Sequence, residues 1–291
     1  MDAKDIIKRV RKIEIKSRGL STQVFSGEYH SAFKGKGVSF DKVRAYEPGD
    51  DIRTIDWNLT AKYDEAFVKV FEEERALNVL LMVDLSASML LGSNKETKRN
   101  LITEICSVLA FSAVQNNDKI GLVLFTDKVE KYIPEQRGKA HILKIIRELL
   151  EFNPDSKLAD INTAISFAGN VVKKRSVVFL ISDFINVQLN DKIKAIAKKH
   201  DLIVLKIQDK LDKELPDLGL LHIEDPETGN IITVDTSDKS IQKAFQDQYL
   251  NNETLLNNLL LSSKIDHAEI NTGDNFINPL LRIFKSRGAR N

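Results

Sequence analysis

Three oxygen-bearing side chains follow an apolar run at alternating positions. Residues 78–89 read NVLLMVDLSASM, and the run ends in Asp84, Ser86 and Ser88. A short stretch of Val, Leu and Met bounded by polar residues is typical of a strand that is buried on both faces. Ligands of open α/β sheets bind in the crevice outside the carboxyl ends of such strands. The three side chains are therefore placed where a hard cation could be held.

A second carboxylate, Asp183, closes another apolar run, SVVFLI at residues 176–181. If the two strands are parallel and near one another, Asp84 and Asp183 reach the same edge of the sheet and can share one ion. A ligand set made only of oxygen atoms suits Mg²⁺ or Mn²⁺ better than Zn²⁺. Mg²⁺ keeps several waters, which leaves a coordination position for an incoming carboxylate or phosphate.

Other interpretations of these residues stay open. Asp84 and Ser86 could cap a following helix, since Asp and Ser are favoured caps. Asp84 and Asp183 could also serve a Mg²⁺-dependent phosphohydrolase, although the chain lacks a phosphate loop and a positioned base. A nucleophilic role for Ser86 or Ser88 is disfavoured because no Gly-x-Ser-x-Gly turn surrounds them. The histidines are scattered without ligand spacing: His30, His141, His200, His222 and His267.

The rest of the chain alternates between strand and helix patterns after residue 78. Apolar runs separated by amphipathic segments indicate a parallel sheet with right-handed crossovers. The predicted fold class is therefore α/β, a doubly wound and mostly parallel sheet. Predicted strands are 119–126, 176–181, 202–207 and 268–270, with a hairpin over 222–234; predicted helices are 96–116, 142–152, 161–173, 191–199, 240–261 and 279–285.

Residues 1–77 differ from this pattern and are predicted to form a separate N-terminal part, with residues 78–291 as the α/β domain. A stripe of Ile and Val over 3–13 predicts a helix that docks on its own domain, with a basic membrane-surface helix as the alternative. Residues 27–75 are dense in Gly, aromatic and charged residues, and strand-like alternation makes this piece β-rich. Its charges predict an ion-pair network that holds the piece against the main domain, with a partner-binding face as the alternative. These charged residues are Arg44, Asp50, Asp51, Arg53, Asp56, Lys62 and Arg75.

Composition excludes several classes of function. The 291 residues carry 43 basic and 42 acidic side chains, a formal net charge of +1, so a global electrostatic grip on nucleic acid is not expected. The single cysteine, Cys106, lies on an apolar helical face and is predicted to be buried, which fits a reducing compartment. No window has the ~18 apolar residues of a membrane helix, and the N-terminus lacks a signal-peptide core. We expect a soluble, cytoplasmic protein.

Two resemblances connect these motifs. Asp84-x-Ser86-x-Ser88 after a strand, with a later Asp183, resembles the metal-ion-dependent adhesion site (MIDAS) of von Willebrand factor A domains. The text GKGVSFDKVRAYEPGDDIRTIDWNLTAKYDEAFVKVFEEER at residues 35–75, with LLRIFKSR at 280–287, resembles the domain-of-unknown-function 58 family. Members of that family are often encoded beside MoxR-type AAA+ ATPases.

The adhesion-site resemblance implies roles for each residue. The two serines and a threonine would touch the metal, the two aspartates would act partly through water, and a partner carboxylate would complete the shell. The threonine is missing: its loop is 156–161, SKLADI, with Ala159 before Asp160. Asp160, a water or the loop serine could fill the position, while Thr163 lies too far down the helix. The resemblance thus implies a non-catalytic protein-interaction module with a weakened Mg²⁺ or Mn²⁺ site, working with a MoxR-type ATPase.

Overall fold

A six-stranded sheet forms the centre of the protein. The computed structural model describes residues 3–21, 29, 32, 38–63, 65–73, 77–93, 97–185, 191–225 and 229–289. The strand order is β10-β7-β6-β3-β4-β5, and every neighbouring pair is parallel except β4 and β5. The strands are β3 (Asn78–Asp84), β4 (Lys119–Phe125), β5 (Val129–Gln136), β6 (Val177–Ser182), β7 (Asp201–Gln208) and β10 (Asp266–Asn271).

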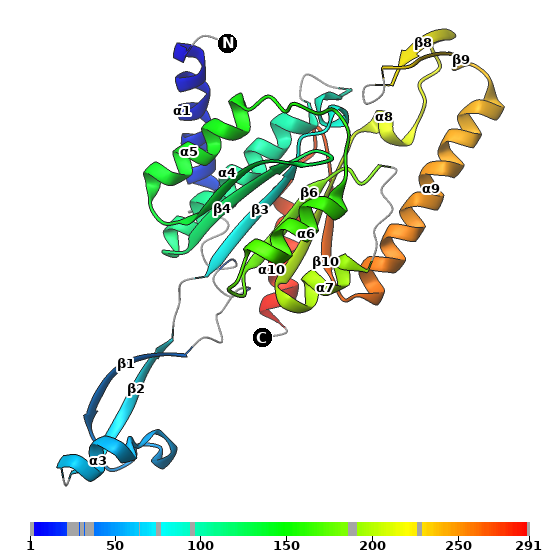
Figure 1. Cartoon of the computed structure of the whole chain (residues 1–291). Helices are drawn as coiled ribbons and strands as arrows, with labels where there is room; N and C mark the ends of the chain where they lie inside the picture. The colour runs from blue at the N-terminus through cyan, green and yellow to red at the C-terminus, as the bar shows by residue number, and fades with distance from the viewer. Residues whose placement is uncertain are drawn as a thin grey trace.

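Helices cover both faces of this sheet, so the predicted doubly wound α/β class is confirmed (Figure 1). Alternate side chains of each central strand enter separate cores: Leu81 of β3 faces the first, and Met82 faces the second. Both side chains are fully buried, which explains why β3 reads as an unbroken apolar run. The first core contains α4 (Lys98–Gln115), α5 (Lys139–Glu151) and α10 (Ile277–Gly288); the second contains α6 (Ile161–Val171), α7 (Lys192–Lys199) and α9 (Lys239–Ser262).

The antiparallel edge strand β5 was not predicted. Its sequence, VEKYIPEQ, is mostly half-buried, and only Ile133 is buried, so it lacks the apolar run that marks the central strands. Pro134 is compatible with this position because edge strands tolerate a missing backbone donor. The pairing with β4 has an irregularity between Ile120 and Leu122, which leaves Gly121 out of register.

Gly121→Ala is expected to destabilise the protein by about 1–3 kcal/mol, the range for overpacking a tight core. A Cβ at position 121 would lie 2.9 Å from the Ile133 carbonyl oxygen, a backbone atom that cannot rotate away. Denaturant unfolding followed by circular dichroism measures the effect. Gly169→Ala in α6 is the matched control, because nothing lies within 4 Å of its new Cβ and alanine favours a helix. Equal stability of the Gly121→Ala variant and the wild type would contradict the close approach.

The N-terminal helix packs on the sheet domain, as its apolar stripe predicts. Helix α1 (Ala3–Leu20) runs seven residues beyond the predicted end, and Val10 and Ile13 lie against the first core. Ion pairs Lys16–Glu104 and Glu14–Lys139, both with N–O distances of 2.6 Å, join it to α4 and α5. The division of the chain into residues 1–77 and 78–291 stays a prediction.

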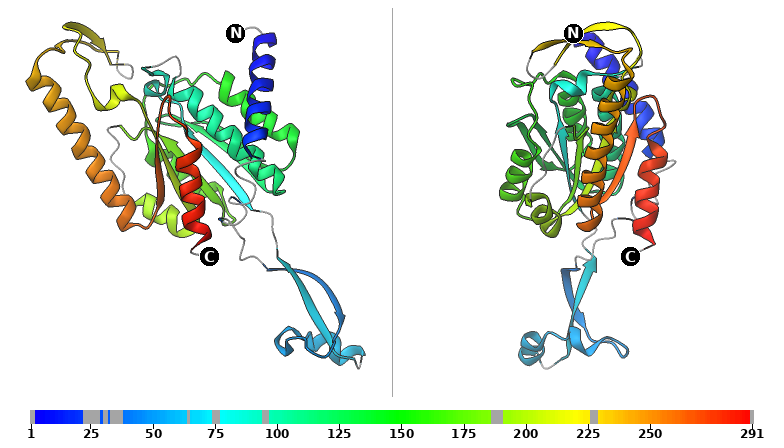
Figure 2. Two further views of the ribbon diagram at one scale, coloured as in Figure 1. Left: turned by 180° about the vertical axis from the view of Figure 1, so that it is seen from behind. Right: turned by 90° about the vertical axis from the view of Figure 1, so that its right-hand side faces the viewer.

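A small antiparallel arm stands away from the sheet domain in both Figure 1 and Figure 2. It consists of β1 (Val38–Ala45), β2 (Phe67–Glu73), a short 3-10 turn η2 (Ile52–Thr54) and α3 (Trp57–Tyr63). Its apolar side chains Ile52, Trp57 and Tyr63 are 65%, 67% and 58% exposed. Trp57 is the only tryptophan of the chain.

The charges of this arm form local contacts. Arg44 donates two hydrogen bonds to Asp50, at 2.8 and 2.7 Å, and Lys69 lies 3.5 Å from Asp56. Asp51 accepts from the backbone N–H of Arg53, and Arg75 lies outside the described residues. The ion pairs described here thus join parts of the arm to each other, whereas the prediction had them holding the arm against the main domain.

The C-terminal part adds a hairpin and a long helix beside the sheet. Strands β8 (Leu220–Glu224) and β9 (Ile231–Asp235) pair as predicted. Of the turn predicted at residues 227–230, residues 227 and 228 lie outside the described residues. A short helix, α8 (Lys210–Lys213), follows β7 and was not predicted. No helix within the described ranges has the length and apolarity needed to cross a bilayer.

Candidate functional site

Asp84 is the last residue of β3, and its carboxylate is completely buried at the carboxyl edge of the sheet. One oxygen accepts from the backbone N–H of Ser86 at 2.8 Å, and the other accepts from the hydroxyl of Ser182 at 2.7 Å. Ser182 is the last residue of the neighbouring strand β6, directly before Asp183. Parallel pairing of β3 and β6 therefore brings the two predicted carboxylates to one edge, linked through the intervening serine.

Burial makes the Asp84 carboxylate unusually hard to ionise. Loss of water around the group, followed by the nearby charge of Asp183, raises the pKa of Asp84 to about 6, against the lowering effect of the hydrogen bonds from Ser86 and Ser182. Asp183 directly follows Ser182, whose hydroxyl donates to Asp84, so the two carboxylates lie at the same edge of the sheet and their charges repel. A positive charge placed between them would relieve that repulsion.

Ser86 and Ser88 turn their hydroxyl groups toward each other in the first turn after β3. Their Oγ atoms lie 3.1 Å apart, and both side chains are buried. This turn is the 3-10 segment η3 (Ala87–Leu90). Ser86 occupies its N-cap position, but the Ser86 side chain makes no capping hydrogen bond. Two adjacent ligands of an octahedral Mg²⁺ with bonds of 2.0–2.1 Å lie about 3.0 Å apart. The serine pair therefore has the spacing of two metal ligands.

Asp183 is held by a lysine that the sequence interpretation did not single out. The Lys98 ammonium, at the start of α4, lies 3.0 Å from Asp183 Oδ2 and 2.7 Å from Asp212 Oδ2. Lys98 has no exposed surface, and Asp183 and Asp212 are almost as buried. Burial acts to lower the pKa of Lys98, but the two carboxylates outweigh it, so the pKa lies above its usual value. The carboxyl edge of the sheet therefore already contains one buried positive charge, the Lys98 ammonium.

A further buried carboxylate, Asp209, ties the loops of this edge together. It accepts from the backbone and hydroxyl of Ser93, the backbone of Leu211 and the hydroxyl of Thr272. Burial alone would raise the pKa of Asp209, but these bonds outweigh it and lower the value to about 2. Asp209 and Asp212 also form the capping box of α8, which fixes Asp212 beside Lys98. The loops after β3, β7 and β10 are therefore joined by their hydrogen bonds to the Asp209 carboxylate.

The loop expected to carry the missing threonine does lie against the serine turn. The backbone N–H of Ala87 donates to the carbonyl of Lys157 at 3.0 Å, and Asp160 N–H donates to Thr126 at the end of β4. Asp160 caps α6. One of its carboxylate oxygens accepts a hydrogen bond from Asn162 N–H, and the other accepts from the Thr163 hydroxyl at 2.5 Å. Its described bonds are therefore those of a helix cap.

The hydroxyl groups of the loop serine, Ser156, and of Thr163, which was expected to lie too far away, are both engaged elsewhere. The hydroxyl of Thr163 donates to Asp160, one turn into the helix. Ser156 contacts the start of β5 through its backbone bond to Glu130, and its hydroxyl accepts from Leu158 N–H at 3.3 Å. Nothing in these contacts directs either hydroxyl to Ser86 or Ser88.

The residues fit a divalent cation in part. Ser86, Ser88 and Asp84 supply neutral and anionic oxygens of the kind that Mg²⁺ prefers. Asp183, however, is already neutralised by Lys98, and Ala159 stands where a threonine would complete the set. Within the described part of the chain no cluster of three or more His, Cys, Asp or Glu side chains is arranged to hold a metal. A cation here would depend on the serine hydroxyls.

Lys98, Asp212 and Asp209 escaped the sequence interpretation, which named Ser182 only as the residue before Asp183 and gave it no role. Lys98 belongs to a polar helix start, KRN, that looks solvent-exposed. The two aspartates lie in DKLD, a pattern that matches a capping box but does not reveal which cation it faces.

The chain matches one family model and is similar to several bacterial proteins described as uncharacterized. The family model "Protein of unknown function DUF58" matches residues 42–255. An uncharacterized protein of Mycobacterium tuberculosis is 26% identical over 243 residues, which span 82% of this chain and 75% of that protein. The uncharacterized protein YeaD of Bacillus subtilis is 28% identical over 107 residues, 37% of this chain and 25% of YeaD.

Similar solved structures have low sequence identity. An aerotolerance-related membrane protein from Bacteroides fragilis is 15% identical, with a TM-score of 0.47, over 74% of this chain and all of that one. The VWA domain of SpRpn10 is 12% identical, with a TM-score of 0.38, over 71% of this chain and 94% of that one. The family model spans more than half of the sequence, so the chain belongs to the family of proteins of unknown function DUF58.

Proposed function

We propose that this protein is a non-catalytic, von Willebrand factor A-like interaction module that captures a carboxylate of a protein partner at the edge formed by β3 and β6. The observation that carries the proposal is the pair of buried hydroxyls, Ser86 and Ser88, 3.1 Å apart beside the Asp84 carboxylate. Ser86 and Ser88 would hold Mg²⁺ or Mn²⁺, with Asp84 and Asp183 acting through water. The bound ion would supply positive charge for the partner's carboxylate.

The protein residues have their own parts in this proposal. Asp84 fixes the turn by accepting from Ser86 N–H, which orients the two hydroxyls. Lys98 neutralises Asp183, so the site would carry less negative charge than two free carboxylates and would bind the ion weakly. The partner in this proposal is a MoxR-type AAA+ ATPase, and the role is assembly or maturation of other proteins.

Ser86→Ala combined with Ser88→Ala is expected to weaken Mn²⁺ binding at least tenfold, because two neutral ligands are removed. Titration calorimetry with MnCl₂ measures the affinity, and circular dichroism checks that the fold is kept. Ser262→Ala is the control, since that exposed hydroxyl donates to the backbone of its own helix at Leu259. Unchanged Mn²⁺ affinity in the double variant would show that the two serines do not bind the ion.

A capture experiment tests the partner. The purified protein should retain a MoxR-type ATPase from native lysate in Mg²⁺, and should lose it in excess chelator or as Asp84→Ala. Equal capture in chelator would mean that no cation takes part in recognition. Turnover of a phosphoester that disappears in Asp84→Ala would replace the proposal by a phosphohydrolase.

A further inference from the structure

The face of α1 that points away from the sheet domain is basic. The apolar stripe of this helix packs on the first core. The opposite face carries four exposed side chains related by steps of three and four residues: Lys8, Arg11, Lys12 and Ile15. Ile15 is 75% exposed. Within the described part of the chain, no ion pair engages the three cations. This face therefore presents three positive charges around one aliphatic side chain.

Helix α5 continues this basic surface beside α1. Lys139, at the start of α5, pairs with Glu14 of α1 at an N–O distance of 2.6 Å, so the two helices are neighbours (Figure 1). On the side of α5 away from the core, Lys144 and Arg147 are exposed. Residues 8–20 and 137–151 together contain nine exposed cations: Lys8, Arg11, Lys12, Lys16, Arg18, Arg137, Lys139, Lys144 and Arg147. We refer to these nine side chains and Ile15 as the α1–α5 surface.

Carboxylates cancel only part of this charge. Four of them lie in the same residues and on the adjoining helix α4: Glu14, Glu104, Glu148 and Glu151. Each one pairs with a lysine or an arginine, and of these four only Glu151 is exposed. Nine cations against four carboxylates leave a surplus of five positive charges, whereas the whole chain has a formal net charge of +1. The positive charge of the protein is thus concentrated on one side.

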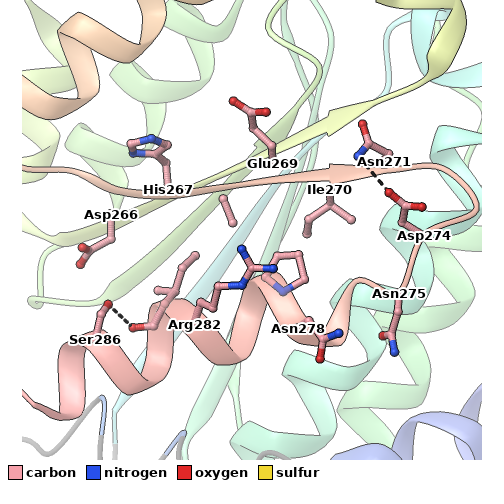
Figure 3. Close-up of a pocket in the computed structure, with 13 residues that line it drawn as sticks. Asp266, His267, Glu269, Ile270, Asn271, Asp274, Asn275, Asn278, Arg282 and Ser286 are labelled. Carbon is pink, nitrogen blue, oxygen red and sulfur yellow. Dashed lines mark hydrogen bonds between the residues drawn. The ribbon is translucent and has the colours of Figure 1, made fainter.

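The far end of the sheet has the reverse charge. β5 and β10 are the two ends of the strand order, and α5 directly follows β5 in the chain. A groove of about 810 Å³ between β10 and α10 is lined by the carboxylates of Asp266, Glu269 and Asp274 and by one guanidinium, that of Arg282 (Figure 3). An anionic plane would attract the α1–α5 surface and repel this groove, so it would bind the domain in one orientation.

Phospholipid headgroups fit this surface better than nucleic acid does. Residues 8–20 and 137–151 contain no Phe, Tyr or Trp, the side chains on which unpaired bases stack. Ile15 finds no apolar partner in a phosphate backbone, but an aliphatic side chain among cations can enter the headgroup layer of a membrane. Each lysine or arginine near an anionic membrane surface contributes about fivefold in affinity. Because the main apolar stripe of α1 is buried in the domain, such binding is peripheral and reversible.

We propose that the α1–α5 surface docks the protein on anionic phospholipid membranes. The cations lie against the lipid phosphates, Ile15 enters the headgroup layer, and the acidic groove beside β10 points away from the bilayer. Ser86 and Ser88 follow the end of β3 and belong to no part of this surface. Membrane docking therefore does not depend on the metal site proposed above.

The test measures cosedimentation of the whole chain with large unilamellar vesicles of phosphatidylcholine, with and without one-third phosphatidylglycerol. Chelator is present throughout, so that no divalent cation bridges the protein to the lipid. The variants are Lys8→Gln with Lys12→Gln, Lys144→Gln alone, and Ile15→Ser, all at exposed positions. Circular dichroism checks that each variant keeps the fold.

The matched control is Lys198→Gln with Lys243→Gln, which removes the same charge as the α1 double variant. These two exposed lysines lie on α7 and α9, the helices that pack over the other face of the sheet. Duplex DNA and poly-glutamate are offered in place of vesicles, as soluble polyanions that lack a headgroup layer.

We expect binding only to the vesicles that contain phosphatidylglycerol. It should be lost at about 1 M NaCl, where the Debye length is about 3 Å instead of the about 10 Å found at about 0.1 M. Lys8→Gln with Lys12→Gln should weaken binding about 25-fold and Lys144→Gln about fivefold, at the contribution per cation given above. Ile15→Ser should weaken it about tenfold through the loss of aliphatic burial, and the control should leave it unchanged.

Absence of binding to either kind of vesicle, or equal binding to both, overturns the proposal. Equal losses in the control and in Lys8→Gln with Lys12→Gln also overturn it, because net charge rather than this surface would then decide binding. Binding of duplex DNA or poly-glutamate that is at least as tight as binding to the vesicles would assign the surface to nucleic acid or to an acidic protein instead.

Discussion

Replacing Lys98 with methionine is expected to lower the free energy of unfolding by about 3–5 kcal/mol, the cost of removing one member of a buried ion pair. Lys98 has no exposed surface and lies 3.0 Å from Asp183 and 2.7 Å from Asp212. Methionine fills a similar volume but leaves two buried carboxylates without a cation. Urea unfolding followed by circular dichroism gives the difference.

Two comparisons separate the charge effect from packing. Lys194→Met removes an exposed pair with Asp191, whose side chains are 47% and 90% exposed, and should change stability by less than about 1 kcal/mol. Adding Asp183→Asn and Asp212→Asn to Lys98→Met should recover most of the loss, because a neutral triad contains no unpaired buried charge. A loss below about 1 kcal/mol for Lys98→Met alone would show that the buried ion pairs do not stabilise the fold.

Asp84→Asn is expected to raise stability at pH 7 and to flatten its dependence on pH between about 4 and 6. The pKa of Asp84 is raised by burial to about 6, from 3.8, so the native state binds the proton more tightly than the unfolded state does. The stability that Asp84 contributes is therefore fully present below about pH 4 and is lost as pH rises through 6. Two pKa units at 1.36 kcal/mol each set an upper limit of about 3 kcal/mol.

The measurement is the difference in unfolding free energy between wild type and Asp84→Asn from pH 4 to 8. Asparagine can still accept from Ser86 N–H and can donate to Ser182, so the local bonds survive. Asp155→Asn is the control, since Asp155 is exposed and surface changes of this kind stay within about 0.5 kcal/mol. Lower stability of Asp84→Asn at pH 7 would show that the site requires a charged carboxylate.

The same variant should lose Mn²⁺ binding while gaining stability. Such opposition between stability and activity is common where a site keeps a strained or repelling group for its function. Equal Mn²⁺ affinity in Asp84→Asn and wild type would exclude a role for the Asp84 charge in holding an ion.

Sequence patterns predicted the buried half of the fold well. The central strands β3, β4 and β6 are apolar on both faces, so runs such as those ending at Asp84 and Ser182 stand out from their polar surroundings. The edge strand β5 and the short helix α8 carry mixed side chains, because each has a solvent-facing side. Whether such a segment forms a strand or a helix depends on contacts with residues far away in the chain, which the periodicity of the sequence does not show.

In the candidate site, too, the local part could be predicted from the sequence and the long-range part could not. Asp84, Ser86 and Ser88 belong to one continuous segment, so their closeness follows from local spacing. That Lys98 contacts both Asp183 and Asp212 depends on contacts across 85 and 114 residues of chain, which no motif encodes. Asp160 was assigned to the site from its place in a loop; the structure shows its cap bonds, and a metal role for it stays a prediction.

The exposed position of Trp57 on the arm has an optical consequence. As the chain's single indole, already two-thirds in water, it should emit at long wavelength in the native state and shift little when the sheet domain melts. Intrinsic tryptophan fluorescence would then change little when the core of the sheet domain unfolds. The same indole makes an unlabelled sensor, blue-shifting when any macromolecule covers the tip of the arm.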